Sequence, residues 1–357
     1  MQQQIRFCKS FDGTRIAYAV SGQGPPILKA PHWLTHLEYE WQSPIWRPWI
    51  EAFSREYTLV RLDERGCGLS DRAMGDFSFD AFVRDMEAVA DSCGFSRFAL
   101  FGHSQGGAVA IEYAARHPER VTHLVLLGAY LRGALRRATP LDAQAEILAQ
   151  LKLVELGWGR EDASYRQMFA MQFMPGGTLD QLRSLSELQR VSSNPEDAVR
   201  ILRTAFELQV RGSAPSVRCP TLVLHARGDL RVPFDEGRLA ASEIPGARLV
   251  PLDTPNHILL AQEPAFGQFF DELRAFIPST AGAAERAFDG LTAREGEILE
   301  HIAQGLDNAQ IAARLELSEK TVRNHITRVF DKIGVESRAQ AIVLARERGL
   351  GQRSRLL

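Results

Sequence analysis

Residues 98–121, FALFGHSQGGAVAIEYAARHPERV, place the spacing Gly102-x-Ser104-x-Gly106 between an apolar run and an amphipathic segment. This spacing is typical of a nucleophile elbow, in which a serine on a sharp strand-to-helix turn presents its hydroxyl above a sheet. Glycines are needed because larger side chains would clash across the turn. An inert turn serine is the alternative, but the strand expected before Ser104 and the helix expected after it favour a nucleophile.

A nucleophilic serine needs a histidine to accept its proton and an acid to orient that histidine, here in the chain order Ser, Asp, His. Asp229 in LVLHARGDLRVP and His257 in LVPLDTPNHILLAQEP each follow a strand-like run. We therefore predict Ser104, Asp229 and His257 as catalytic residues. The alternatives are a surface turn for Asp229 and a capping or solvent-facing role for His257. The other histidines considered are His225 inside a strand, His117 at a helix end, His103 facing away from the elbow by alternation, and His32 and His36 as candidate pocket residues.

The elements that must position these residues alternate between strand and helix. Asp12-Gly13 joins two strand-like runs in an expected hairpin. The later runs PPILKA, YTLVRLD, RFALFG, VTHLVLLGA, PTLVLHA and ARLVPLD are separated by helical stretches, which predicts an α/β fold with a mostly parallel sheet. Between about 131 and 215 only helices are expected, as in a helical lid. The expected linker is residues 278–287, which comprise PSTAGAAER and Ala287. It separates the expected domains 1–277 and 288–357.

Composition supports an ordinary two-domain globular protein of 357 residues with 45% hydrophobic and 24% charged residues. A net charge of −2 excludes a generally basic nucleic-acid coat protein, so any DNA contact must come from a local patch. The four cysteines are far apart without a CxxC pair, and we expect reduced thiols and neither metal nor cofactor. Since no apolar run reaches 18 residues, we expect a cytoplasmic protein without a membrane partner.

The first 277 residues resemble the α/β-hydrolase superfamily through the elbow, the acid and histidine loops, and LDERGCGLSD, which is similar to the D-x-R-G-x-G-x-S segment of that family. More narrowly, they resemble hydrolase-like domains fused to bacterial signalling outputs. The resemblance implies that the backbone N–H groups of Trp33 and Gln105 form the oxyanion hole. The positions of these two donors are assigned to within one residue. Pro31-His32-Trp33 departs from the usual His-Gly-x, so His32 could narrow the site or supply a polar contact. A misplaced oxyanion donor costs about a hundredfold in rate or more, which leaves turnover an open question.

Aromatic residues of the expected lid could line an apolar ligand pocket against Trp33 and Trp41. The alternative is that they form the core of the lid itself, and this alternative is the more common one. The pocket residues predicted on this basis are Trp158, Phe169 and Phe173, together with His32, and Met171 and Met174 lie in the same stretch. We expect a mainly apolar small molecule as ligand.

The C-terminal stretch LTAREGEILEHIAQGLDNAQIAARLELSEKTVRNHITRVFDKIGVESRAQAIVLARERGL reads as four short helices. Thr292 and Glu295 are expected to form a capping box, Gly305 to end the first helix, Asp307 or Asn308 to cap the second, and Ser318 to cap the third. The short turn ELS between the second and third helices is typical of a helix-turn-helix.

This stretch closely resembles the LuxR-type (GerE) DNA-binding domain across about sixty residues, at LTAREGEIL, IAARL, SEKTVRNH and KIGVESRAQA. The resemblance implies that the third helix, 319–332, enters the major groove of double-stranded DNA. A helical dimerisation module with surface charges is the alternative. By matching positions, Arg323, Asn324 and Thr327 face bases, while Lys320, Thr321, Arg328 and Lys332 are placed for phosphates.

Three functions remain open: a transcription regulator whose hydrolase-like domain senses a small molecule, an esterase or lactonase with an appended module, and a binding scaffold with a dead pocket. The complete triad disfavours the scaffold, and the complete helix-turn-helix disfavours the pure enzyme. We therefore predict a regulator, with hydrolysis of its ligand left open. From Leu291 to Leu357 there are 11 Lys and Arg against 9 Asp and Glu, a net charge of +2, so one domain alone should bind DNA weakly and we expect a homodimer.

Overall fold

The computed structural model describes residues 1–72, 75–138, 141–158, 164–277, 288, 290–335, 337–347 and 350–351. Contacts divide the chain into two compact units, Met1–Ile277 and Pro278–Leu357. The expected linker 278–287 lies outside the described residues. Within the described part of the chain, no helix is both long and apolar enough to cross a membrane.

The first unit is built on an eight-stranded sheet with the order β1-β2-β4-β3-β5-β6-β7-β8. The first hairpin and the β2–β4 pair are antiparallel, and all the other pairs are parallel. The central strands β5 and β7 are buried along their whole length, as expected of strands covered on both faces. The predicted α/β class is confirmed. The strands are β1 Gln3–Lys9, β2 Arg15–Ser21, β3 Pro26–Lys29, β4 Thr58–Leu62, β5 Phe98–His103, β6 Val121–Leu127, β7 Thr221–Ala226 and β8 Arg248–Leu252.

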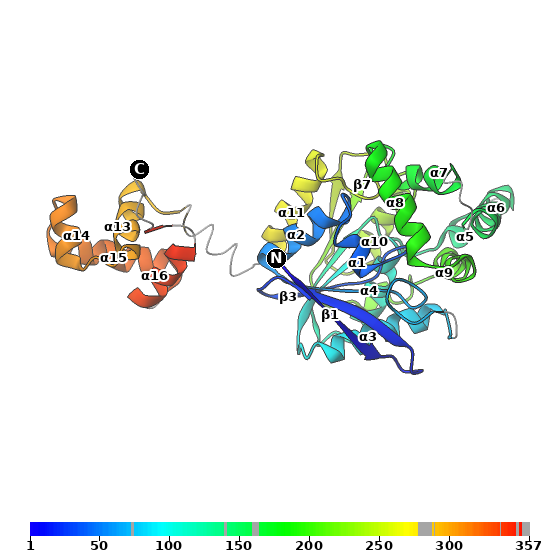
Figure 1. Cartoon of the computed structure of the whole chain (residues 1–357), viewed down its shortest axis with the longest axis horizontal. Helices are drawn as coiled ribbons and strands as arrows, with labels where there is room; N and C mark the ends of the chain where they lie inside the picture. Colours follow the sequence, from blue (N-terminus) through cyan, green and yellow to red (C-terminus); the bar gives the residue numbers. More distant parts are fainter. Residues whose placement is uncertain are drawn as a thin grey trace. The chain divides into compact units, whose positions relative to one another are not determined.

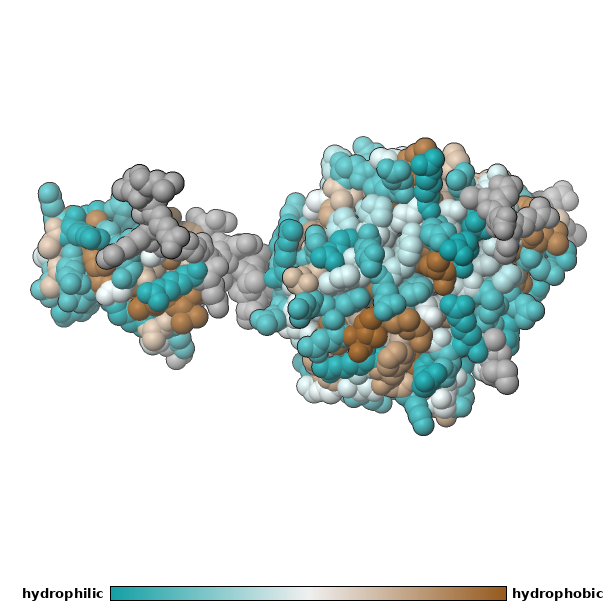
Figure 2. All heavy atoms as spheres, viewed as in Figure 1, coloured by the Kyte–Doolittle hydropathy of each residue, from teal (hydrophilic) through white to brown (hydrophobic). Residues whose placement is uncertain are grey.

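Helices lie on both sides of this sheet (Figure 1). Trp49 joins two of them to the sheet, because its ring lies 6.0 Å from that of Phe101 on β5 and 4.9 Å from that of Phe269. Hydrophilic residues cover most of the visible face of the first unit (Figure 2), as expected once the apolar helix faces are buried. These helices are α1 Leu37–Glu40, α2 Trp46–Glu56, α3 Phe79–Ser92, α4 Gln105–Arg116, α10 Phe234–Glu243 and α11 Pro264–Phe276.

The stretch expected to be a lid is helical in its described residues, and Figure 1 draws its helices in green. Local sequence sets two of the helix starts: Thr178 and Gln181 form a capping box, and Asn194 caps a helix that begins with Pro195. An isolated antiparallel bridge joins Arg132 to Gln209 at the base of the lid. The lid elements are α5 Ala134–Arg137, α6 Leu141–Gly157, α7 Ser164–Phe173, α8 Leu179–Ser192, α9 Pro195–Glu207 and the 3₁₀ turn η1 Ala214–Ser216.

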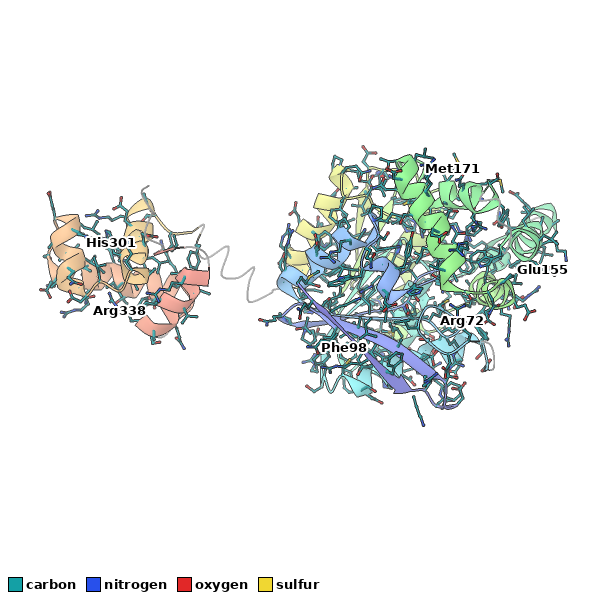
Figure 3. All side chains as sticks on the ribbon, viewed as in Figure 1. Arg72, Phe98, Glu155, Met171, His301 and Arg338 are labelled. Carbon is teal, nitrogen blue, oxygen red and sulfur yellow. The ribbon has the colours of Figure 1, made fainter. Side chains whose placement is uncertain are left out.

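The second unit contains a small helical core that includes Ile298, Ile311, Val322 and Val329. The predicted capping box of Thr292 and Glu295 is present, Asp307 caps the second helix and Ser318 caps the third. Arg338, labelled in Figure 3, joins the fourth helix to the second by donating to the Asn308 side chain at 3.0 Å. The described helices are α13 Ala293–Ala303, α14 Asn308–Leu315, α15 Glu319–Ile333 and α16 Arg338–Glu347.

Candidate functional site

Ser104 occupies the sharp turn between β5 and α4 with a φ of +56°. This left-handed conformation is costly for a residue with a side chain and is found mainly where the surrounding structure enforces it. The turn is tight, since a Cβ at Gly102 would lie 2.6 Å from Gly107 Cα, and one at Gly106 would lie 2.5 Å from the Pro31 carbonyl oxygen. The glycines therefore allow the backbone to hold Ser104 in a strained position at the end of the strand.

His257 and Asp229 form a buried pair with 2.6 Å between His257 Nδ1 and Asp229 Oδ2. The other oxygen of Asp229 accepts the backbone N–H groups of Arg231 and Val232, each at 2.8 Å. Burial alone would raise the pKa of Asp229, but the charge and hydrogen bond of His257, together with the Val232 N–H, hold that pKa below its ordinary value. An ionised Asp229 keeps the proton of His257 on Nδ1 and leaves Nε2 as the basic nitrogen.

His257 Nε2 is buried and has no hydrogen-bond partner among the described residues. Such an orphaned nitrogen is unusual in a folded protein and is suited to accept a proton from a reacting group. The loop that carries His257 is tied to the lid, because the N–H groups of His257 and Ile258 both donate to the carbonyl of Phe173 at the end of α7, at 2.9 and 3.1 Å.

Ser104 lies on the walls of two small cavities of ≈ 40 Å³ and ≈ 10 Å³. Trp33 and Phe173 line both cavities, and Gln105 lines the larger one. A site for a drug-sized molecule usually measures about 300 Å³ or more, so both cavities are smaller than such a molecule.

The loop predicted to supply an oxyanion donor contains a buried polar network around His32. Lys29 Nζ lies 2.6 Å from His32 Nδ1, and His32 Nε2 lies 3.7 Å from a Glu40 oxygen. Burial, with the charge of Lys29 added, lowers the pKa of His32 well below its ordinary value, so the ring is neutral. His32 lines the ≈ 10 Å³ cavity and packs against Trp46, with ring centres 4.1 Å apart and the ring planes tilted by 42°.

Among the predicted pocket aromatics of the lid, one lines the cavities and two pack against Trp33. The Phe173 ring lies 5.7 Å from that of His257. Trp158 and Phe169 instead pack against Trp33, at 6.0 and 6.1 Å, and do not line either cavity in the described structure. Met171 is 54% exposed and lies at the outer surface of the lid (Figure 3).

The positions of three histidines differ from the predictions or add to them. His103 does not face away from the site: its Nε2 lies 3.1 Å from the His257 carbonyl oxygen, and it lines a cavity with Ser104. Strand alternation fails there because β5 ends at His103 and the chain turns sharply at Ser104. His36 caps α1 and does not line either cavity, and His225 lies 3.6 Å from Asp229 as a second neighbour of the acid.

Sequence reasoning also missed Arg137 and Arg231, which line the ≈ 40 Å³ cavity with Ser104. They add two cationic groups to the mainly apolar lining that was expected. The position of Arg231, two residues after Asp229 in GDLRVP, was the available signal.

In the second unit, α15 presents one polar face and one apolar face. The predicted contact residues Lys320, Arg323, Asn324, Thr327 and Arg328 are exposed at helical spacing, while Val322, Ile326 and Val329 are buried. Thr321 is half-buried, and its N–H donates to the capping Ser318. Lys332 is exposed, pairs with Glu295 at 2.6 Å and donates to the Gly290 carbonyl, so it holds α15 against α13, and its contact with a phosphate stays a prediction.

Two family descriptions match the sequence in separate segments. Residues 39–264 match the alpha/beta hydrolase fold, and residues 289–345 match bacterial regulatory proteins of the luxR family. A putative carbamate hydrolase RutD of Azorhizobium caulinodans is 29% identical over 253 residues, which cover 69% of this chain and 89% of that protein. The AB hydrolase superfamily protein YisY of Bacillus subtilis is 26% identical over 70% of this chain and 88% of its own length.

Solved structures show the same fold. A hydrolase from Pseudomonas aeruginosa PA01 superposes with a TM-score of 0.64 at 22% identity, covering 77% of this chain and 98% of its own. An enol-lactonase from Burkholderia xenovorans LB400 gives a TM-score of 0.60 at 22% identity, covering 76% and 99%.

Proposed function

Since the chain belongs to the α/β-hydrolase family and ends in a LuxR-type DNA-binding domain, we propose that it is a transcription regulator whose hydrolase-fold domain binds a small molecule. The observation that carries this proposal is that one chain combines the Ser104 site with the exposed polar face of α15. Double-stranded DNA is the proposed partner of the second unit, as the luxR-family match supports, and we propose the cytoplasm as the site of action. We further propose that the DNA-bound form is a homodimer.

The site is suited to cleave a carboxylic ester bound beside Ser104. Ser104 Oγ would attack the carbonyl carbon while its proton passes to His257 Nε2, and Asp229 would stabilise the resulting imidazolium. The N–H groups of Trp33 and Gln105 are the proposed donors to the oxyanion. Collapse would expel the alcohol, which takes the proton from His257, and water would then release the acid from the acyl-enzyme by the same route.

On DNA, the proposed base contacts are Arg323, Asn324 and Thr327, because these side chains are exposed on successive turns of α15. Arginine pairs well with guanine and asparagine with adenine in the major groove. Lys320, Thr321, Arg328 and Lys332 are the proposed phosphate contacts.

A fluorophosphonate probe tests the first half of this proposal. One adduct per chain is expected by intact mass for the natural protein, and none for Ser104→Ala. Selection of bound duplexes from a random pool tests the second half and should return one preferred sequence. A folded protein that stays unlabelled would contradict the nucleophile, and a pool recovered without any preference would contradict the regulator.

An esterase or lactonase with an appended module is the second candidate, favoured by the hydrolase relatives and by the short His257–Asp229 contact. Selection from the random pool separates the candidates, because this enzyme would bind DNA without sequence preference. Probe labelling of Ser104 is expected of both candidates.

A further inference from the structure

Two arginines from distant parts of the sequence share the cavity wall with Ser104. Arg137 ends the lid helix α5, and Arg231 lies in the loop of the acid Asp229. Both are half-buried, and both line the ≈ 40 Å³ cavity together with Tyr130.

Neither guanidinium forms an ion pair with any side chain that the structure describes. Arg231 Nη1 donates to the neutral side chains of Gln150 and Gln172, each at a long 3.3 Å. Its guanidinium otherwise lies over aromatic rings, with the Phe169 and Phe173 centres at 5.1 Å. Arg137 donates to the Arg132 carbonyl at 2.6 Å and lies over the Tyr130 ring at 5.3 Å.

The carboxylates described near these arginines are engaged elsewhere. Asp229 binds His257, and Glu236 pairs with Arg132 and accepts the N–H of Leu131. Burial lowers the pKa of Arg231 to about 10, and that of Arg137 is lowered for the same reason, so both groups keep their charge at neutral pH. Asp229 acts on both arginines, and Glu236 on Arg137, only at longer range. Two half-buried positive charges without a direct ion pair among the described residues are unfavourable, and an anionic group in the cavity would satisfy them.

We propose that Arg137 and Arg231 bind a carboxylate carried by the ligand, so that the site takes esters or lactones with a second, anionic end. The planar fork of arginine suits a carboxylate, which can accept two parallel hydrogen bonds. Phe173, Leu202 and Phe206 line the same cavity and would contact a short apolar chain between the carboxylate and the carbonyl group at Ser104. This assignment rests on the proposed function, because it places the reacting carbonyl beside Ser104.

Two probes that differ only in this charge test the assignment: mono-4-nitrophenyl glutarate, with a free carboxylate, and its methyl ester. Binding is measured by calorimetry in Ser104→Ala, where the nucleophile is absent. The free acid should bind about tenfold tighter or more, as expected for charge-assisted hydrogen bonds. Adding Arg231→Gln or Arg137→Gln should reduce this preference to about twofold or less. Arg136→Gln, at an exposed neighbour on the same helix, is the matched control and should keep the full preference.

Release of 4-nitrophenolate by the protein with Ser104 intact separates this assignment from the nucleophile. A binding preference without turnover supports the arginine pair and contradicts catalysis by Ser104. Turnover without a binding preference for the free acid supports catalysis by Ser104 and contradicts the arginine pair. Equal binding of the two probes, failure of both to bind, or a preference that survives both arginine substitutions overturns the assignment.

Discussion

At the scale of single residues, the hydrolase unit concentrates its unusual features around one serine. Ser104 has a left-handed backbone, His257 Nε2 is buried without a partner in the described structure, and Asp229 is ionised although buried. Each feature is costly by itself, and together they support the proposed roles of Ser104 as nucleophile and His257 as base. The two arginines on the same wall add a charge preference that the triad does not require.

The proposed base contacts and phosphate contacts of α15 should differ in how their substitution weakens DNA binding. Arg323→Ala should cost about 1–3 kcal/mol on the preferred duplex and relax the preference at one base position, because a bidentate contact to a base edge is lost. Lys320→Ala should weaken binding to all sequences alike and reduce the salt dependence of binding. Fluorescence anisotropy with preferred and scrambled duplexes measures both effects. Equal losses on the two duplexes for both variants would show that Arg323 does not read a base.

At the scale of elements, hydrogen bonds of backbone and side chain join the lid to the loop that carries His257. The end of α7 accepts N–H groups from His257 and Ile258, and Asn256 accepts the N–H of Gly176 at 2.9 Å. Any movement of the end of α7 would therefore act directly on the loop that carries His257. This coupling gives one element-level route by which ligand occupancy can alter the hydrolase unit.

The elbow helix depends on a close approach to the end of β6. A Cβ added to Gly107 in α4 would lie 2.3 Å from Ala129 Cβ, so Gly107→Ala should destabilise the hydrolase unit by about 1–3 kcal/mol in denaturant unfolding. Ala129→Gly removes the opposing methyl group and should recover part of this loss in the double variant. Gly267→Ala is the matched control, because no atom lies within 4 Å of its added Cβ and the change should stabilise α11 slightly. Additive effects of Gly107→Ala and Ala129→Gly would rule out the contact.

In the second unit, the start of α13 depends on an ionised Glu295. The hydrogen bonds from Lys332 and from the Thr292 backbone lower the pKa of Glu295 to about 2. Because the folded-state pKa is depressed, the stability from this group is present above the ordinary range near pH 4.5 and is lost as the pH falls toward 2. Glu295→Gln should therefore lower the hydrogen-exchange protection of α13 amides at pH 7. In this variant, the protection should fall less between pH 4.5 and pH 2 than it does in the natural protein. Glu297→Gln, which removes only an exposed pair with Arg294, should leave both unchanged, and the same acid profile in all three proteins would contradict the assignment.

Periodicity and turn residues predict the strands, the lid helices and three helix caps, because these depend on local sequence. Ser104, Asp229 and His257 could be named as candidates because each follows a strand, and parallel strands bring their carboxyl ends to one edge of a sheet. Arg137 could not be found this way, since it reaches the cavity through the packing of α5, which local patterns do not specify. The ion pair of Lys332 with Glu295 could not be read from local sequence, because it spans 37 residues and depends on how α13 and α15 pack. Its phosphate contact stays a prediction.

At the scale of the whole molecule, regulation requires that ligand binding in one unit change DNA binding by the other. A ligand can shift such an equilibrium only if it binds the competing states with different affinities. A change in dimerisation of the hydrolase unit is a sufficient mechanism, because it alters the effective concentration of the second DNA-binding unit without any precise orientation between the units.

This mechanism predicts that the fragment 288–357 binds DNA much more weakly than the full chain at equal salt. One DNA-binding domain has a net charge of +2 over Leu291 to Leu357 and makes few phosphate contacts, whereas two domains on one duplex bind with a shared entropic cost. The fragment contains its own buried core, so it is a suitable test object. Footprinting of the full chain should show two protected half-sites about one helical turn, roughly 34 Å, apart. Sedimentation of the complex should give two chains per duplex. If the fragment binds as tightly as the full chain, or if one full-length chain saturates a single half-site, dimerisation does not control DNA binding, and the ligand must act through the segment that joins the units.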